Sequence, residues 1–184
     1  MGTRKKSTED KIREQEQKYR VVTAALLADV SSGWSGEVSI NPTNTGCSVD
    51  VRYSLFKDGT RRHAYAIEVK ERERPVVDGK RLFNNVPLKC RKYELMFDEF
   101  ENMKAKKKDL LYLVYLDDGN AYVFNVSDSG KTVQYQTVNV TEKYTEYDDD
   151  SQVGKIPCYL LPLRDAVKII PSEKYMKMYG GMDN

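Results

Sequence analysis

The chain contains very little histidine, cysteine and tryptophan. Its 184 residues include one histidine (His63), one tryptophan and three widely separated cysteines, Cys47, Cys90 and Cys158. The cysteines form no C-x-x-C pair, and structural zinc sites need four closely spaced Cys or His ligands. This scarcity argues against a zinc site or a disulfide scaffold, and it predicts three free thiols in a reducing compartment.

A long apolar run is also missing. A helix that crosses a membrane needs about 18 or more consecutive apolar residues, and the sequence has no such stretch. Residues 1–20 are highly charged and lack the apolar centre of a secretory signal peptide. We therefore expect a cytoplasmic protein with no membrane partner, in a phage or a bacterial host.

Charge of one sign is not in large excess over the whole chain, whose formal net charge is +2. Between residues 70 and 108, however, basic residues outnumber acidic residues by twelve to seven. A locally basic face on a nearly neutral protein suits an anionic partner such as DNA, although charge runs are also common on surfaces that bind nothing.

Length and patterning predict one domain over residues 9–171, preceded by a flexible basic arm at 1–8 and followed by a tail at 172–184. Periodicity and turn residues predict helices at 7–30 and 86–108, strands at 37–42, 47–56 and 61–72, a hairpin at 109–126, extended segments at 132–145 and 155–163, and a helical turn at 164–170. This order predicts an α/β fold in which helices flank a central mixed β-sheet.

The stretch HAYAIEVKER, residues 63–72, ends an apolar strand with an acidic and a basic residue. Glu68 and Lys70 are two residues apart, so their side chains point to the same side of the strand. The pattern [DE]-x-K occurs four times in the chain, and this is the one occurrence at the end of an apolar strand. We therefore take Glu68 and Lys70 as candidate functional residues.

A second carboxylate belongs to the preceding strand. The Asp-Gly turn at 57–60 predicts a hairpin in which Asp50 faces residue 67, one step from Glu68. Two neighbouring carboxylates repel each other unless a cation lies between them, and oxygen ligands suit a hard ion such as Mg²⁺. The alternative is a surface ion pair between Glu68 and Lys70, with Asp50 paired to Arg52 or Arg62.

Asp50, followed by Glu68-Val69-Lys70, resembles the D…(D/E)-x-K signature of the PD-(D/E)XK nuclease superfamily. The order of elements is similar over residues 9–126, with the nearest likeness to Holliday-junction-resolvase-like and phage-type nucleases. Val49 stands where the signature has a proline. The resemblance implies a restriction-endonuclease-like fold and an endonuclease that hydrolyses DNA, including branched or junction DNA.

The resemblance also implies roles for individual residues. Asp50 and Glu68, with the backbone carbonyl of Val69, are expected to hold Mg²⁺ or Mn²⁺. Lys70 is expected to position or deprotonate the attacking water and to stabilise the developing charge. A glutamate of the first helix often joins such sites; Glu14 and Glu16 are the candidates here, followed by Glu9, and helical phase does not choose between them.

Basic residues outside the signature are candidates for contacts with DNA phosphates. Lys89 and Lys92 lie at the start of the predicted second helix, and Arg62 lies beside the hairpin turn with Arg61. An exposed helix start explains the two lysines equally well. His63 is expected to be a polar strand residue with no role in the site.

Two other functions remain open. A nuclease-like fold can serve as a non-catalytic DNA-binding or assembly protein, and an RNA-directed nuclease would use the same residues. Residues 72–85 are a candidate substrate-selecting loop, and a homodimer is expected by analogy with junction resolvases.

Overall fold

The structure is a computed structural model that describes residues 34–40, 48–71, 76–77, 80–81, 83–116, 118–142 and 154–171. The predicted first helix with its three glutamates, the arm at 1–8 and the tail at 172–184 lie outside these residues. None of the described helices is long and apolar enough to cross a membrane.

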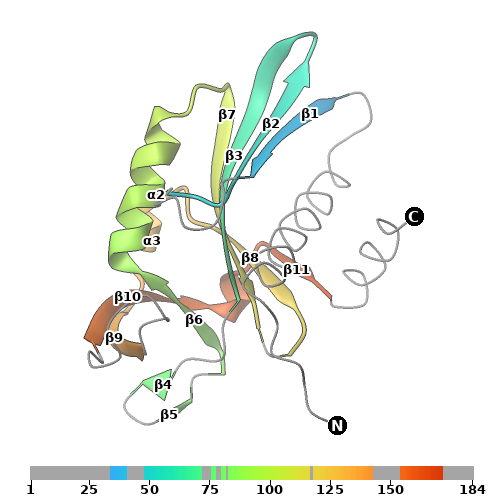
Figure 1. Ribbon diagram of the computed structural model, residues 1–184. Helices are drawn as coiled ribbons and strands as arrows, with labels where there is room; N and C mark the ends of the chain where they lie inside the picture. Colours follow the sequence, from blue (N-terminus) through green and yellow to red (C-terminus); the bar gives the residue numbers. More distant parts are fainter. Residues whose placement is uncertain are drawn as a thin grey trace, which may run out of the picture.

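A six-stranded sheet forms the centre of the fold (Figure 1). Its strands, in spatial order, are β1 (Ser35–Ile40), β2 (Val51–Lys57), β3 (Thr60–Glu71), β7 (Lys107–Tyr115), β8 (Ala121–Asn125) and β11 (Lys168–Ile170). β3 and β7 are parallel, and every other neighbouring pair is antiparallel. The predicted α/β fold with a central mixed sheet is therefore confirmed.

The β2–β3 hairpin forms as the sequence predicts. Its turn residues Asp58 and Gly59 have φ angles of 53° and 68°, the left-handed values that a tight two-residue hairpin requires. A β-bulge between Leu55 and Phe56 shifts the register, so that Val51 lies opposite Ile67. The predicted pairing of Asp50 with residue 67 is thus wrong by one, and continuing the observed register places Asp50 opposite Glu68.

A second, three-stranded sheet replaces the predicted start of the long helix. It has the order β6 (Asn85–Lys89), β10 (Gly154–Pro162), β9 (Thr137–Glu142). Val86, Pro87 and Leu88 are buried in β6, where pairing with β10 satisfies an apolar run that a helix start would leave exposed. Among the described residues β6 pairs on one side alone, so the missing N–H of Pro87 is tolerated there.

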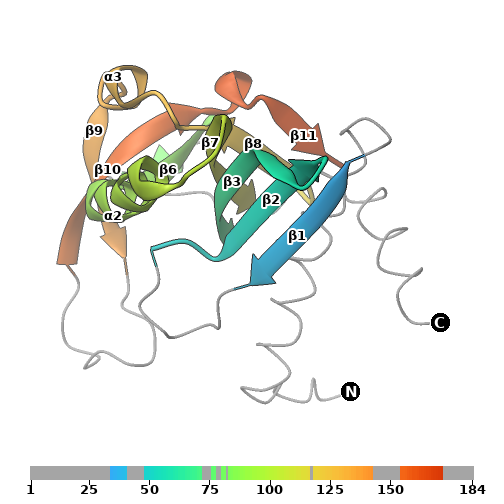
Figure 2. The same cartoon turned by 90° about the horizontal axis from the view of Figure 1, so that it is seen from above.

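The helix α2 (Cys90–Asn102) lies along one face of the central sheet (Figures 1 and 2). The predicted apolar stripe is confirmed as core: Tyr93, Met96 and Phe100 are buried, and Phe97 and Met103 pack against the same cluster. The opposite face of the sheet carries a second buried cluster that includes Ile67, Val69 and Leu113. β3 therefore contributes to both cores, and its alternate residues face α2.

The remaining elements are short. β4 (Val76–Val77) and β5 (Lys80–Arg81) form a two-stranded ribbon within the predicted loop at 72–85. The helix α3 (Ser129–Thr132) precedes β9, so the extended segment predicted at 132–145 begins later than expected. A 3-10 turn, η1 (Leu163–Asp165), and β11 take the place of the helical turn predicted at 164–170. Cys90 and Cys158 form no disulfide among the described residues, and Cys47 lies outside them.

Candidate active site at the end of β3

Asp50 is fixed to β3 by its backbone and by its side chain. Its N–H donates a hydrogen bond to the carbonyl of Ile67 at 3.0 Å. Its Oδ2 accepts a hydrogen bond from the N–H of Val69 at 2.8 Å. The predicted convergence of Asp50 with the E-V-K segment is therefore present in the structure.

Glu68 is a fully buried carboxylate between two lysines. Its relative exposure is 0%, while Lys70 Nζ lies 2.7 Å from Oε1 and Lys92 Nζ lies 3.0 Å from Oε2. Within the described part of the chain, neither oxygen accepts a hydrogen bond of normal geometry. The ion pair between Glu68 and Lys70 that the alternative expects is present, but Glu68 is buried and not at the surface, and Arg52 contacts Glu99.

Burial and neighbouring charges perturb both members of the E-x-K pair. Burial raises the pKa of Glu68, Lys70 and Lys92 oppose this effect, and the nearby Asp50 carboxylate adds to it. Burial alone would lower the pKa of Lys70, but Glu68 and Asp50 outweigh it and raise that pKa above its ordinary value. The site therefore combines a carboxylate that is costly to ionise with an ammonium group that stays protonated.

The three predicted phosphate contacts occupy different places. Lys92 lies on the first turn of α2 and points into the site, where it contacts Glu68. Lys89 is half-buried at the junction of β6 and α2. Arg62 lies six residues before Glu68 along β3, roughly 20 Å away at the rise of a strand, so the fold does not bring it to the site.

The donor set fits a hard divalent ion with a small number of protein ligands. The described residues contain no group of three or more His, Cys, Asp and Glu side chains able to hold a metal. Mg²⁺ commonly keeps several waters and uses one or two carboxylates, which Asp50 and Glu68 can supply beside the Val69 carbonyl. The observation that supports this fit is the buried Glu68 carboxylate, whose oxygens accept no hydrogen bond of normal geometry from the described residues.

A third acidic residue contacts the segment that carries Asp50, and the sequence motif does not reveal it. The carboxylate of Glu99 on α2 accepts hydrogen bonds from Ser48 Oγ and Arg52 Nε. Ser48 and Arg52 lie two residues before and two residues after Asp50. One feature of the sequence could have pointed to Glu99. It lies seven residues after Lys92, so the two residues share one face of a helix.

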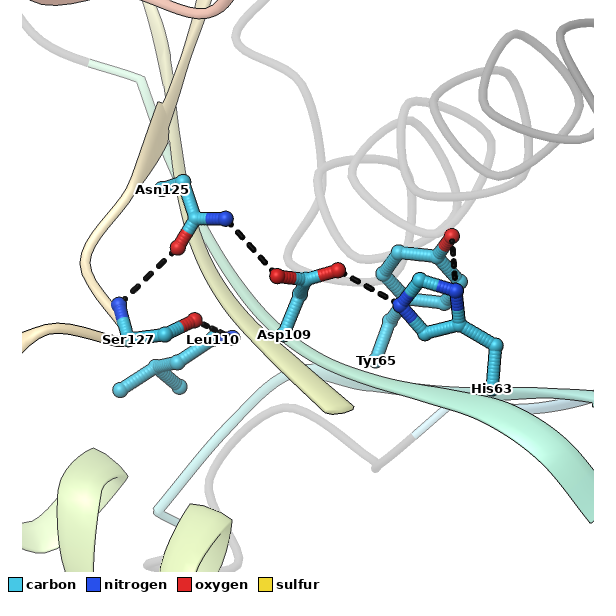
Figure 3. A network of polar contacts seen from close by, with 6 residues as sticks. All are labelled: His63, Tyr65, Asp109, Leu110, Asn125 and Ser127. Carbon is cyan, nitrogen blue, oxygen red and sulfur yellow. Dashed lines mark hydrogen bonds and ion pairs between the residues drawn. The ribbon is translucent and has the colours of Figure 1, made fainter. Parts of the chain in front are cut away.

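A separate polar network surrounds the single histidine (Figure 3). His63 Nε2 lies 2.6 Å from Asp109 Oδ2, and the Tyr65 hydroxyl lies 3.2 Å from His63 Nδ1. Asn125 Nδ2 donates to Asp109 Oδ1 at 2.8 Å, which links β8 to the pair. His63 is thus a polar strand residue, as expected, and its partners join β3, β7 and β8.

The chain is similar to a solved structure, whereas the searches by sequence found no match. No protein-family model matches the chain, and no curated protein matches it. The structure of Hjc, a Holliday junction resolvase from the archaeal hyperthermophile Archaeoglobus fulgidus, is similar with a TM-score of 0.42 and 13% sequence identity. The match covers 88% of this chain and 98% of that chain. A likeness at this level does not assign the chain to a family.

Proposed function

We propose that the protein is a Mg²⁺- or Mn²⁺-dependent endonuclease that hydrolyses phosphodiester bonds in DNA. The observation that carries the proposal is the fully buried Glu68 carboxylate, next to Asp50 and in contact with Lys70 and Lys92. Burying a carboxylate beside a second one is unfavourable. A divalent ion between the two acids would relieve their repulsion.

Each residue then has a specific task. Asp50 and Glu68 would hold the ion, which supplies a more acidic water and neutralises charge on the reacting phosphate. Lys70 is 37% exposed, so its ammonium group is accessible to a phosphate that arrives from solvent. Because its pKa is raised, Lys70 acts in this proposal as a cation that stabilises negative charge rather than as a base.

The test is a cleavage assay with Mg²⁺, Mn²⁺ or chelator on linear, single-stranded, flapped and four-way-junction DNA and on RNA. We expect ion-dependent DNA cleavage that Lys70→Ala abolishes while calorimetric metal binding is retained. Lys107→Ala, at an exposed position of β7, is the matched control and should cleave normally. Cleavage that persists in purified Lys70→Ala protein would rule out this assignment.

A non-catalytic DNA-binding or assembly protein is the second candidate. It is favoured by the contacts of Glu68, whose two oxygens each face a lysine and are therefore compensated without a metal. Calorimetry separates the two functions. Absence of Mn²⁺ and Mg²⁺ binding at millimolar concentration, together with retained DNA binding, would favour the non-catalytic function.

A further inference from the structure

The segment that carries Asp50 is attached to α2 at two points. Ser48 and Asp50 precede β2, and Arg52 is its second residue, so the three lie within five residues of one another. Ser48 donates to one oxygen of Glu99 and Arg52 donates to the other. A single carboxylate therefore bridges two residues that lie two positions before and two positions after Asp50.

The same helix also contacts the other acidic residue of the site. Lys92, one turn into α2, lies 3.0 Å from Glu68, and Glu99 lies two turns further along the same helix face. α2 is held against the sheet by Tyr93, Met96 and Phe100, which are all buried. The packed helix therefore contacts both Glu68 and the segment that carries Asp50.

We propose that Glu99 is a positioning residue that holds residues 48–52 so that Asp50 can share a divalent ion with Glu68. This inference rests on the proposed function and adds to it a residue that does not contact the ion. Glu99 is 14% exposed and Arg52 is 45% exposed, and ion pairs of this kind contribute little to global stability. The bridge is therefore better explained by local geometry than by a contribution to the overall stability of the fold.

The first experiment measures Mn²⁺ affinity by calorimetry in full-length Glu99→Gln. We expect a loss of about 10-fold, the size typical for groups that orient metal ligands. Glu94→Gln is the matched control, because Glu94 is exposed on the same helix and pairs with Arg91.

The second experiment needs no metal and no activity. The Asp50 amide donates to the Ile67 carbonyl, so its hydrogen exchange reports whether this segment stays closed. We expect exchange about 10-fold faster in Glu99→Gln than in the wild type and Glu94→Gln, with smaller increases in Ser48→Ala and Arg52→Gln.

The two measurements separate the two proposals. Unchanged Asp50 exchange in Glu99→Gln overturns the positioning role, and so does a loss of affinity that Glu94→Gln shares. A wild-type protein that binds no Mn²⁺ overturns the proposed function and with it the role of Glu99 toward the ion. In that case, the exchange data still decide whether Glu99 holds the segment.

Discussion

At the scale of single residues, Glu68 is the fully buried acid of the candidate site. Its side chain is completely buried, and the two lysines that contact it do not fully offset the loss of solvation, so its pKa is raised. A buried carboxylate with a raised pKa lowers the free energy of unfolding at neutral pH. Such perturbed groups are expected at functional sites, including sites that bind an ion.

The raised pKa of Glu68 predicts a pH dependence of stability. A raised folded-state pKa means that the folded state binds the proton more tightly than the unfolded state. The stabilisation is fully present below the ordinary value of 4.5 and is lost as pH rises through the folded-state pKa. In chelator-treated samples, the wild type should therefore gain stability relative to Glu68→Gln as pH falls from 7 to 4.5, measured by urea unfolding. A difference between the two proteins that is constant across this range would contradict the prediction.

Tyr65 gives a second prediction at this scale. Burial, the Asp109 charge and Tyr53 raise the pKa of Tyr65 to about 12, compared with 10.0 for an ordinary tyrosine. The stabilisation is complete below pH 10 and is lost as pH rises toward 12, because the unfolded state then releases a proton that the folded state keeps. Tyr65→Phe should lose less stability over this interval than the wild type, and its tyrosinate absorbance should lack one late transition. Equal losses in the two proteins would show that Tyr65 ionises normally.

At the scale of elements, α2 ends in a side-chain cap supplied by the next strand. Lys108 Nζ donates to the carbonyls of Phe100 and Glu101 at 3.1 and 3.0 Å, and it lies 4.6 Å from the centre of the Phe100 ring. A cation at this position adds a donor to the Phe100 carbonyl, which also accepts from the Met103 N–H, and it opposes the negative end of the helix dipole.

Replacing Lys108 by methionine should therefore destabilise the protein by about 1 kcal/mol, the scale of a charged group at a helix C-terminus. Methionine keeps most of the apolar stem, so the loss reports the ammonium group. Lys107→Met is the control, because Lys107 is exposed at the first position of β7. Urea unfolding of the two variants provides the comparison, and equal stabilities would show that the cap contributes nothing.

The elements also show how far local sequence determines the structure. The hairpin was predictable because its turn chemistry is local, and the apolar stripe of α2 was predictable from its period. The start of α2 was not, because the run Val86–Leu88 becomes a strand through pairing with β10, about 70 residues later in the chain. The bulge in the β2–β3 pair was also invisible in the sequence, and it moved Asp50 by one position.

At the scale of the whole molecule, the candidate site depends on contacts between distant segments. The convergence of Asp50 with Glu68 and Lys70 was predictable, because one hairpin joins the strands that carry them. The approach of Lys92 and Glu99 was not, because it depends on how α2 packs over the central sheet. The same packing makes the site part of the global fold, since α2 and β3 contribute to a shared core cluster.

An ion that binds between Asp50 and Glu68 should therefore stabilise the entire fold. Binding to the folded state alone adds about 2.7 kcal/mol at an ion concentration of 100 times the Kd. We expect Mn²⁺ or Mg²⁺ to raise the melting temperature above its value in chelator, and the rise should be lost in Asp50→Asn and Glu68→Gln. Lys70→Ala should keep the rise, because that variant removes a positive charge and leaves both acidic ligands.

Because Lys70 and Lys92 already face Glu68, the ion must compete with them for the Glu68 oxygens. The rise in melting temperature in Lys70→Ala should therefore be at least as large as in the wild type. An equal rise in Asp50→Asn would place the ion elsewhere and would contradict the proposed site.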